Sequence, residues 1–120
     1  MITIYSNPTA DAAWTTEERK TLDTTHGAVI EELASKGELI DTNELDTENA
    51  TVIGHHNGQP ITTRGPFTEG TEYIGGYYLV DVASHERAVE IAGKFAEVKY
   101  SPIEVRRLMH TEEQNPSEKS

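Results

Sequence analysis

The sequence contains no cysteine, few basic residues and no long apolar run. Without cysteine, the 120-residue chain has no disulfide, no thiol nucleophile and no thiolate metal ligand. No apolar stretch approaches the roughly 20 residues that a membrane-spanning helix needs. The first residues also lack the basic and apolar segments of a secretory signal. We therefore expect a cytoplasmic protein that does not act on membranes.

Basic residues are scarce, because 21 Asp and Glu face only 10 Lys and Arg, which gives a net charge of −11 at pH 7. Nucleic-acid binding needs a clustered basic surface, and the sequence offers only Arg106-Arg107. We therefore expect no nucleic-acid partner. The mean hydropathy of −0.59 is typical of one polar-surfaced globular domain. We assign it to residues 1–110 and expect the polar tail, residues 111–120, to be disordered.

The first third of the chain predicts a strand followed by a helix. Residues 1–5 form a short apolar run, and Asn7-Pro8 ends it. Thr15 and Glu18 have the spacing of a capping box, which predicts a helix over 15–36 that stops at Gly37. At a helical period one stripe of this helix is apolar apart from a histidine. The stripe is Leu22, His26, Val29 and Leu33, with Ile30 at its edge.

The rest of the chain predicts a hairpin, a strand, a second helix and a last strand. Residues 39–45 favour an irregular or edge segment. Asn57-Gly58 between two β-prone runs is a strong hairpin signal for residues 50–63. A strand over 77–82 follows, and Ser84 can cap a helix. The apolar face of that helix is Ala88, Ile91, Ala92 and Phe95, and residues 103–108 predict the final strand.

This order of elements predicts an α+β, ferredoxin-like split β-α-β fold with an added hairpin. Both helices then cover the same face of the sheet. Residues on the two sides of the strand at 77–82 are bulky, with Tyr77 and Leu79 on one face and Tyr78 and Val80 on the other. The second face therefore needs a cover. A twin subunit is the simplest one, so we expect a homodimer.

The segment from Gly65 to Val82, GPFTEGTEYIGGYYLVDV, is the most distinctive part of the sequence. Proline fixes a bend at its start, and glycine permits close backbone approach and positive φ. We interpret Gly75-Gly76 as a hinge before the strand. A loop built in this way is a candidate functional element, because binding and catalytic residues often lie on loops.

Gly65-Pro66-Phe67 followed by Gly75-Gly76-Tyr77-Tyr78 resembles the YCII-related superfamily, in the branch named for an Asp-Gly-Pro-Phe motif. Further matches are the helix start at Trp14, Glu17, Glu18 and Arg19, the segment His26 with Glu31-Glu32-Leu33, and the final IEVR run. The resemblance implies a dimeric α+β barrel and a pocket lined by a helix histidine paired with an acid. It also implies a link, in one branch, to dehydrochlorination of hydroxyquinones. The chain departs from the motif, with Arg64 in place of the aspartate and Thr71 in place of a common lysine.

His26 is the first candidate catalytic residue. An imidazole titrates near neutrality and serves as base or acid if a carboxylate fixes its tautomer. Asp81 and Glu72 are the further catalytic candidates, and Glu69 is a third acid that can supply the partner. The alternative interpretation is a buried histidine whose nitrogens are satisfied within the core.

The candidate ligand-binding residues are Arg64, Phe67, Glu69 and Tyr77. An arginine can clamp a carboxylate, and a phenol can donate to a substrate oxygen. A surface ion pair for Arg64 and core packing for Tyr77 are the alternatives. His55 and His56 are strand neighbours that point to opposite faces, so we expect no metal site there.

The function that these residues favour is a small-molecule enzyme. In it, His26 acts as acid or base on an oxygenated organic substrate, without a cofactor. The alternative is a non-catalytic module that binds a metabolite or a partner protein and has a regulatory role.

Overall fold

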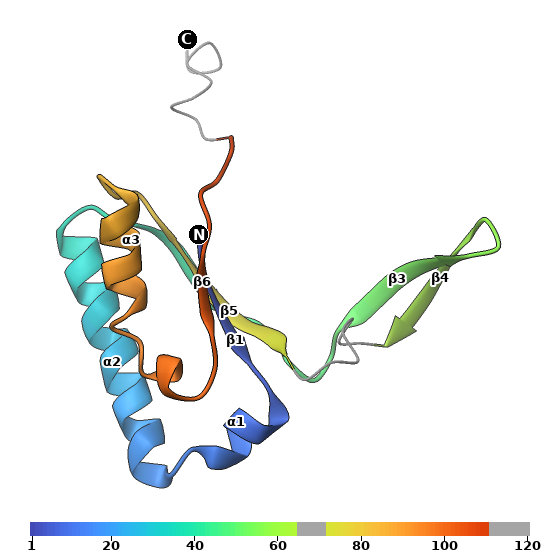
Figure 1. The fold of residues 1–120 in the computed structure, drawn as a ribbon, viewed down its shortest axis with the longest axis horizontal. Helices are drawn as coiled ribbons and strands as arrows, with labels where there is room; N and C mark the ends of the chain where they lie inside the picture. Colours follow the sequence, from blue (N-terminus) through green and yellow to red (C-terminus); the bar gives the residue numbers. More distant parts are fainter. Residues whose placement is uncertain (65–71, 111–120) are drawn as a thin grey trace.

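The main sheet has four antiparallel strands, and both long helices lie on one of its faces (Figure 1). Its strands are β1 (Ile2–Ser6), β2 (Leu39–Glu44), β5 (Tyr73–Val80) and β6 (Ile103–Val105), and the helices are α2 (Thr16–Ser35) and α3 (His85–Ala92). The computed structural model describes residues 1–64 and 72–110. The strand order within the sheet is β2-β5-β1-β6. Along the chain, α2 follows β1 and precedes β2, and α3 follows β5 and precedes β6. The predicted ferredoxin-like α+β fold is therefore confirmed for the single chain.

Both long helices begin at the predicted caps. The Thr15 hydroxyl accepts from the backbone N–H of Glu18 at 3.1 Å, and the Glu18 carboxylate accepts from the backbone N–H of Thr15 at 3.1 Å. Ser84 accepts from the backbone N–H of Arg87 at 3.1 Å. α2 ends just before Gly37, whose φ of +70° suits glycine. Reciprocal capping satisfies N–H groups that a helix start leaves open, so these short motifs fix where the helices begin.

Two short helices were missed by the sequence analysis. Asn7-Pro8 was interpreted as a break, and β1 does end there, but the same pair begins helix α1 (Pro8–Ala13). The Asn7 side chain caps α1 by accepting from the backbone N–H of Ala10 at 2.7 Å, and proline suits the first helical position. A 3₁₀ turn, η1 (Ala96–Lys99), follows α3.

The core lies between the sheet and the two long helices. Its largest fully buried side chains are Phe95, Ile2, Leu33 and Ile91. Each contributes about 1.5–3 kcal/mol through burial. Val29 and Leu33 of the predicted α2 stripe are buried, as are the apolar residues predicted for α3. The helical periods in the sequence therefore identified the packed faces correctly.

The segment predicted as irregular or edge is the edge strand β2, whose pairing with β5 shifts between Leu39 and Asp41. Two other strands differ from prediction. β6 ends three residues before the predicted limit. β5 begins at Tyr73, so Gly75-Gly76 lies inside a strand and the hinge interpretation is wrong. A Cβ on Gly76 would lie 2.9 Å from the backbone oxygen of Asn43 on β2, which is closer than a side chain tolerates. Glycine at this position permits close strand pairing.

The predicted hairpin is present as β3 (Thr51–His56) and β4 (Gln59–Arg64). Asn57 and Gly58 have φ of 50° and 79°, the positive values that a tight two-residue hairpin turn requires. The two strands form a sheet of their own. In Figure 1 this hairpin projects away from the main sheet, on the side opposite α2 and α3.

Candidate functional site

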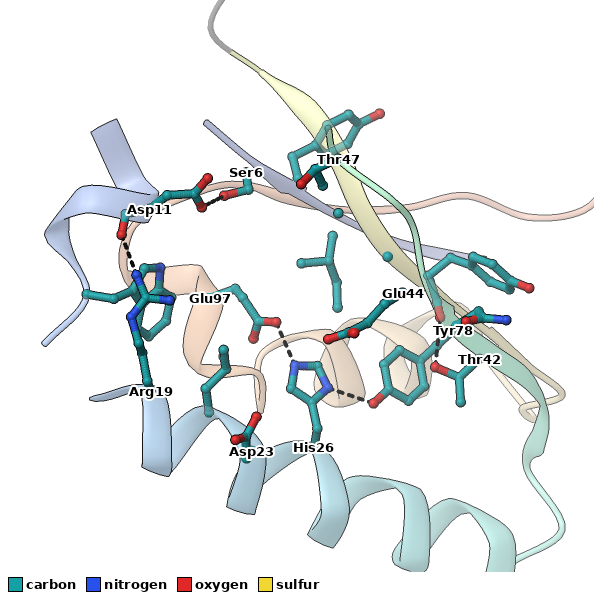
Figure 2. Close-up of a pocket in the computed structure, with 18 of the residues that line it drawn as sticks. Ser6, Asp11, Arg19, Asp23, His26, Thr42, Glu44, Thr47, Tyr78 and Glu97 are labelled. Atoms are coloured by element: carbon teal, nitrogen blue, oxygen red, sulfur yellow. Dashed lines mark hydrogen bonds and ion pairs between the residues drawn. The ribbon is translucent and has the colours of Figure 1, made fainter. Parts of the chain in front are cut away.

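A pocket of about 550 Å³ opens between α2 and the neighbouring ends of β1, β2 and β5. His26, Tyr78 and Glu97 lie together at its inner wall (Figure 2). Its rim holds aromatic rings from Trp14 and Tyr73, and a glycine stretch of β5 forms part of its floor. A cavity of this size is large enough for a small organic ligand.

Both ring nitrogens of His26 make short hydrogen bonds. Nε2 lies 2.6 Å from Oε2 of Glu97, and Nδ1 lies 2.7 Å from the hydroxyl of Tyr78. The side chains are mostly covered, with 25% of His26 and 15% of Glu97 exposed. Phe95 stacks on the His26 ring with centroids 4.9 Å apart, so the imidazole is held on its face as well as at its edges.

The carboxylate of Glu97 determines which nitrogen of His26 carries the proton. An ionised carboxylate only accepts hydrogen bonds, so the neutral ring donates from Nε2–H to Glu97. Nδ1 then accepts the O–H of Tyr78. When the ring is protonated it donates at both nitrogens, and the Tyr78 hydroxyl hydrogen is released from Nδ1. The protonation state of His26 therefore controls whether Tyr78 can donate to another group.

Tyr78 keeps its proton under ordinary conditions. It is 3% exposed, and burial raises its pKa above the usual value of 10, with a smaller contribution from the negative charge of Glu97. Its ring contacts Phe95 with centroids 4.7 Å apart. Tyr78 is therefore a neutral phenol fixed by packing, which is the form that donates or accepts a hydrogen bond.

Glu97 reaches His26 because η1 is fastened to the start of α2. The Glu18 carboxylate accepts from Lys99 Nζ at 2.7 Å and from the Tyr100 hydroxyl at 2.7 Å. The hydrogen bond from Lys99, followed by the one from Tyr100, makes the largest contribution to lowering the pKa of Glu18 from 4.5 to about 2. Trp14 packs edge-to-face against Tyr100 with centroids 4.8 Å apart. One glutamate thus caps α2 and anchors the turn that carries Glu97.

The second carboxylate oxygen of Glu97 is incompletely satisfied. Oε1 is buried and has no hydrogen-bond partner among the described residues. A buried acceptor of this kind costs about 1–3 kcal/mol relative to a satisfied one. Structural carboxylates are usually paired more fully, so this oxygen marks the site as unusual within the fold.

Acidic side chains outnumber basic ones around the pocket. Asp11, Asp23 and Glu44 line it together with Glu97, whereas Arg19 is the lining residue with a permanent positive charge. Nη2 of Arg19 already donates to the backbone oxygen of Asp11 at 2.7 Å. The electrostatic environment therefore disfavours an anionic ligand relative to a neutral or cationic one.

The predicted site residues are scattered relative to this pocket. Tyr77 contributes to the lining, and its hydroxyl donates to Asp41 at 2.7 Å. Glu72 accepts from the Asn7 side chain at 3.4 Å. Asp81 is exposed just after β5, and Arg64 is exposed at the end of β4. Phe67 and Glu69 lie outside the described residues. Of the predicted site residues that the structure describes, His26 and Tyr77 line the pocket, whereas Arg64, Glu72 and Asp81 do not.

The acid beside His26 is Glu97, in place of the predicted Glu72, Glu69 or Asp81. Glu97 is 71 residues away in the sequence, on a 3₁₀ turn that no pattern predicted. Neither this turn nor its attachment to α2 has a sequence signal of its own.

No metal cluster and no spanning helix are found in the part of the chain that the structure describes. Residues 1–64 and 72–110 contain no group of three or more His, Asp or Glu placed to hold a metal ion. Within the same residues no helix is both long and apolar enough to cross a bilayer. His55 and His56 are adjacent in β3, where alternate residues face opposite sides.

The fold and the pocket define a small α+β domain of ferredoxin-like topology with a histidine-lined cavity at one end of the sheet. The model of the YCII-related domain matches residues 1–112, so the chain belongs to the YCII-related family. The chain is also 32% identical over 89 residues to an uncharacterised protein of Rhizobium meliloti (strain 1021). That alignment covers 73% of this chain and 72% of the relative.

Proposed function

We propose that the protein is a small-molecule enzyme in which His26 transfers a proton to or from an oxygenated organic ligand in the pocket. The observation that carries this proposal is the hydrogen-bonded chain from Tyr78 through His26 to Glu97. A histidine with one nitrogen on a carboxylate has a fixed tautomer, which is the arrangement that general acid–base catalysis uses. No step requires a cofactor.

In this mechanism Tyr78 is the group that faces the ligand and His26 is the proton store. With neutral His26, the lone pairs of the Tyr78 oxygen are available to accept a proton from a ligand hydroxyl while Tyr78 passes its own proton to Nδ1. Glu97 stabilises the imidazolium that results. Return of the proton reverses the relay, so Tyr78 and His26 together move a proton without forming a free phenolate.

The ligand class follows from the charges and rings around the pocket. The acids at the rim disfavour carboxylates and phosphates, whereas Trp14 and Tyr73 offer faces to an aromatic or other flat ligand. We therefore expect uncharged hydroxylated rings to bind more tightly than their carboxylate counterparts. Membership in the Asp-Gly-Pro-Phe branch is part of this proposal and is supported by Gly65-Pro66-Phe67 in the sequence, because the family model that matches is that of the YCII-related domain as a whole.

A non-catalytic binding protein is the second candidate, and one observation favours it. Both nitrogens of His26 are occupied within the protein, so a ligand contacts the imidazole directly only after displacing Tyr78 or Glu97. In a binding module the relay stays intact and the pocket only selects the ligand. Turnover of a bound ligand separates the two candidates.

We also propose that two copies pair through the uncovered sheet face to form a dimeric α+β barrel. The sheet face opposite the core that Ile2 and Ile4 enter supports this assembly, because both long helices lie on the other face (Figure 1). Tyr77 and Leu79 are half-buried and share that face by strand alternation. We also propose that this dimer is located in the cytoplasm.

A ligand screen by thermal shift tests the proposed function. Wild type, His26→Gln and Glu97→Gln are compared against phenols, hydroxyquinones and the matching aromatic carboxylates. We expect one hydroxylated class to raise the Tm of wild type and to lose most of that effect in both variants. Any compound that binds is then tested for chemical conversion by mass spectrometry.

His85→Gln is the matched control, because His85 is an exposed histidine on α3 outside this pocket. This variant should respond to ligands as wild type does. A ligand shift that survives in His26→Gln contradicts the assigned site. Binding without conversion, lost in both variants, supports the binding module instead of the enzyme.

A further inference from the structure

The strands of the β3–β4 hairpin form a sheet of their own, separate from the main sheet of the described chain. The hairpin extends from the body on the side that α2 and α3 leave uncovered (Figure 1), and its strands pair only with each other. An isolated two-stranded hairpin is marginally stable in water. Ile53 is 72% exposed and Ile61 is 45% exposed, so the hairpin presents apolar side chains without a cover in the single chain.

The charge of this segment is opposite to that of the body. Residues 49–68 contain no Asp or Glu and one arginine, Arg64. The remaining 100 residues therefore carry all 21 acids against nine Lys and Arg, a net charge of −12 at pH 7. A stretch of 20 residues without an acid is exceptional in so acidic a chain. It makes the hairpin the part of the molecule best suited to approach an acidic surface.

One face of the hairpin carries an apolar side chain, Ile53, and a basic one, Arg64, whereas Ile61 lies on the opposite face, across from Gly54. The strand pairing sets Ile53 opposite Thr62 and Thr51 opposite Arg64. Because alternate residues share a face, Ile53 and Arg64 lie on the same side, together with His55. This face combines an exposed aliphatic anchor with a permanent positive charge, which is the composition of a docking surface for an acidic protein.

We propose that the β3–β4 hairpin is an arm that docks on the acidic body of a second copy of this chain. The arm stands on the same side of the molecule as the uncovered sheet face, so a second copy seated on that face lies within the corner between sheet and arm. Two-fold symmetry then places the arm of each copy against the body of the other. The inference rests on the dimer proposed above and adds that the β3–β4 hairpin stabilises that dimer.

Sedimentation velocity and hydrogen exchange on the full chain test the proposal. The variants are Ile53→Glu and Arg64→Glu, and the control is Val89→Glu, the same type of change at a 49% exposed residue of α3. We expect each arm variant to weaken dimerisation by about tenfold or more, as when a central interface anchor is lost. The control should dimerise as wild type does. Because arm and body attract by charge, about 1 M NaCl should also weaken the wild-type dimer.

Hydrogen exchange locates the arm directly. The amides of β3 and β4 should exchange rapidly in dilute monomer and become protected at concentrations where the dimer forms. A dimer whose hairpin amides stay unprotected, or one that both arm variants leave intact, overturns the arm and keeps the sheet-to-sheet dimer. A wild type that is monomeric at all concentrations overturns both. Protection of the β3 and β4 amides in the monomer also overturns the arm proposal, because it would show that the hairpin packs on the body of its own chain.

Discussion

The two ends of α2 are built in opposite ways. At its C-terminal end the Glu32 carboxylate accepts from Lys94 Nζ at 2.8 Å and from Lys36 Nζ at 3.2 Å, and Arg87 donates to Glu38 on the adjoining segment at 2.9 Å. These charges pair with one another and close the corner between α2, α3 and β2. At the other end α2 stands beside a cavity of about 550 Å³.

The difference between the two ends of α2 separates residues that stabilise the fold from residues that form the candidate site. The closed end contains Leu33, which is fully buried, and surface charges that form ion pairs with opposite charges. The open end contains a carboxylate oxygen of Glu97 with no partner among the described residues and a histidine between two polar groups. Unsatisfied polarity and empty volume lower stability, so their concentration at one end indicates a functional region.

The largest expected effect is at the closed end. Leu33→Ala removes a fully buried side chain and leaves a cavity, so the free energy of unfolding should fall by about 2–5 kcal/mol. Urea denaturation measures this change. Leu22→Ala at the pocket is the comparison, because Leu22 already borders open space. Equal losses in the two variants would contradict the distinction between a closed and an open end.

A smaller effect is expected at the floor of the pocket. Gly76→Ala should lower the free energy of unfolding by about 1–3 kcal/mol, because the new Cβ would lie 2.9 Å from the backbone oxygen of Asn43. Gly75→Ala is the control, since its Cβ would meet only ordinary contacts at 3.6 Å or more. Denaturation midpoints that rank the two variants in the reverse order would show that β2 and β5 can separate freely.

The ion pairs of the closed end should contribute to the acid dependence of stability. Hydrogen bonds from Lys94, followed by Lys36, lower the pKa of Glu32 from 4.5 to about 2. A lowered folded-state pKa stabilises the fold above pH 4.5, and this contribution is lost as the pH falls from 4.5 through about 2. Glu32→Gln should therefore reduce the drop in Tm over that pH interval. An unchanged slope would show that the carboxylate is not paired in solution.

The smallest effect on stability is expected for the clamp that positions Glu97. Glu18→Gln weakens the contact to Lys99 and Tyr100, so Tm should decrease slightly while ligand-induced Tm shifts decrease strongly. The measurement is the thermal-shift assay with a ligand found in the screen. Glu17→Gln, an exposed acid one residue earlier, is the control. A ligand response equal to that of wild type would show that Glu18 does not position η1.

The sequence predicted those features that depend on local chemistry. Capping at Thr15 and Ser84, the positive φ turn at Asn57-Gly58 and the apolar faces of both helices are encoded within a few residues, and each was confirmed. The length of β5 was not predicted, because the glycine pair suggested a hinge whereas close approach of β2 requires glycine there. Local glycine patterns do not distinguish these two causes.

The candidate site was predictable only in part. His26 stood out because a histidine interrupts an apolar stripe, but its partner depends on tertiary structure. Glu97 joins His26 through a short 3₁₀ turn and through the anchoring of Tyr100 by Glu18, and neither contact has a sequence signal of its own. Glu72 and Asp81, the acids favoured from the sequence that the structure describes, do not line the pocket that holds His26, although Gly75-Gly76 does.

The ring nitrogen spectrum of His26 tests the Tyr78–His26–Glu97 relay most directly. At a pH where the imidazole is neutral, ¹⁵N NMR of wild type should show a single tautomer with the proton on Nε2. Glu97→Leu removes the acceptor and should shift the population toward the Nδ1–H tautomer, whereas His85 should be unchanged. A wild-type ring that averages between tautomers, or one that is insensitive to loss of Glu97, would contradict the relay.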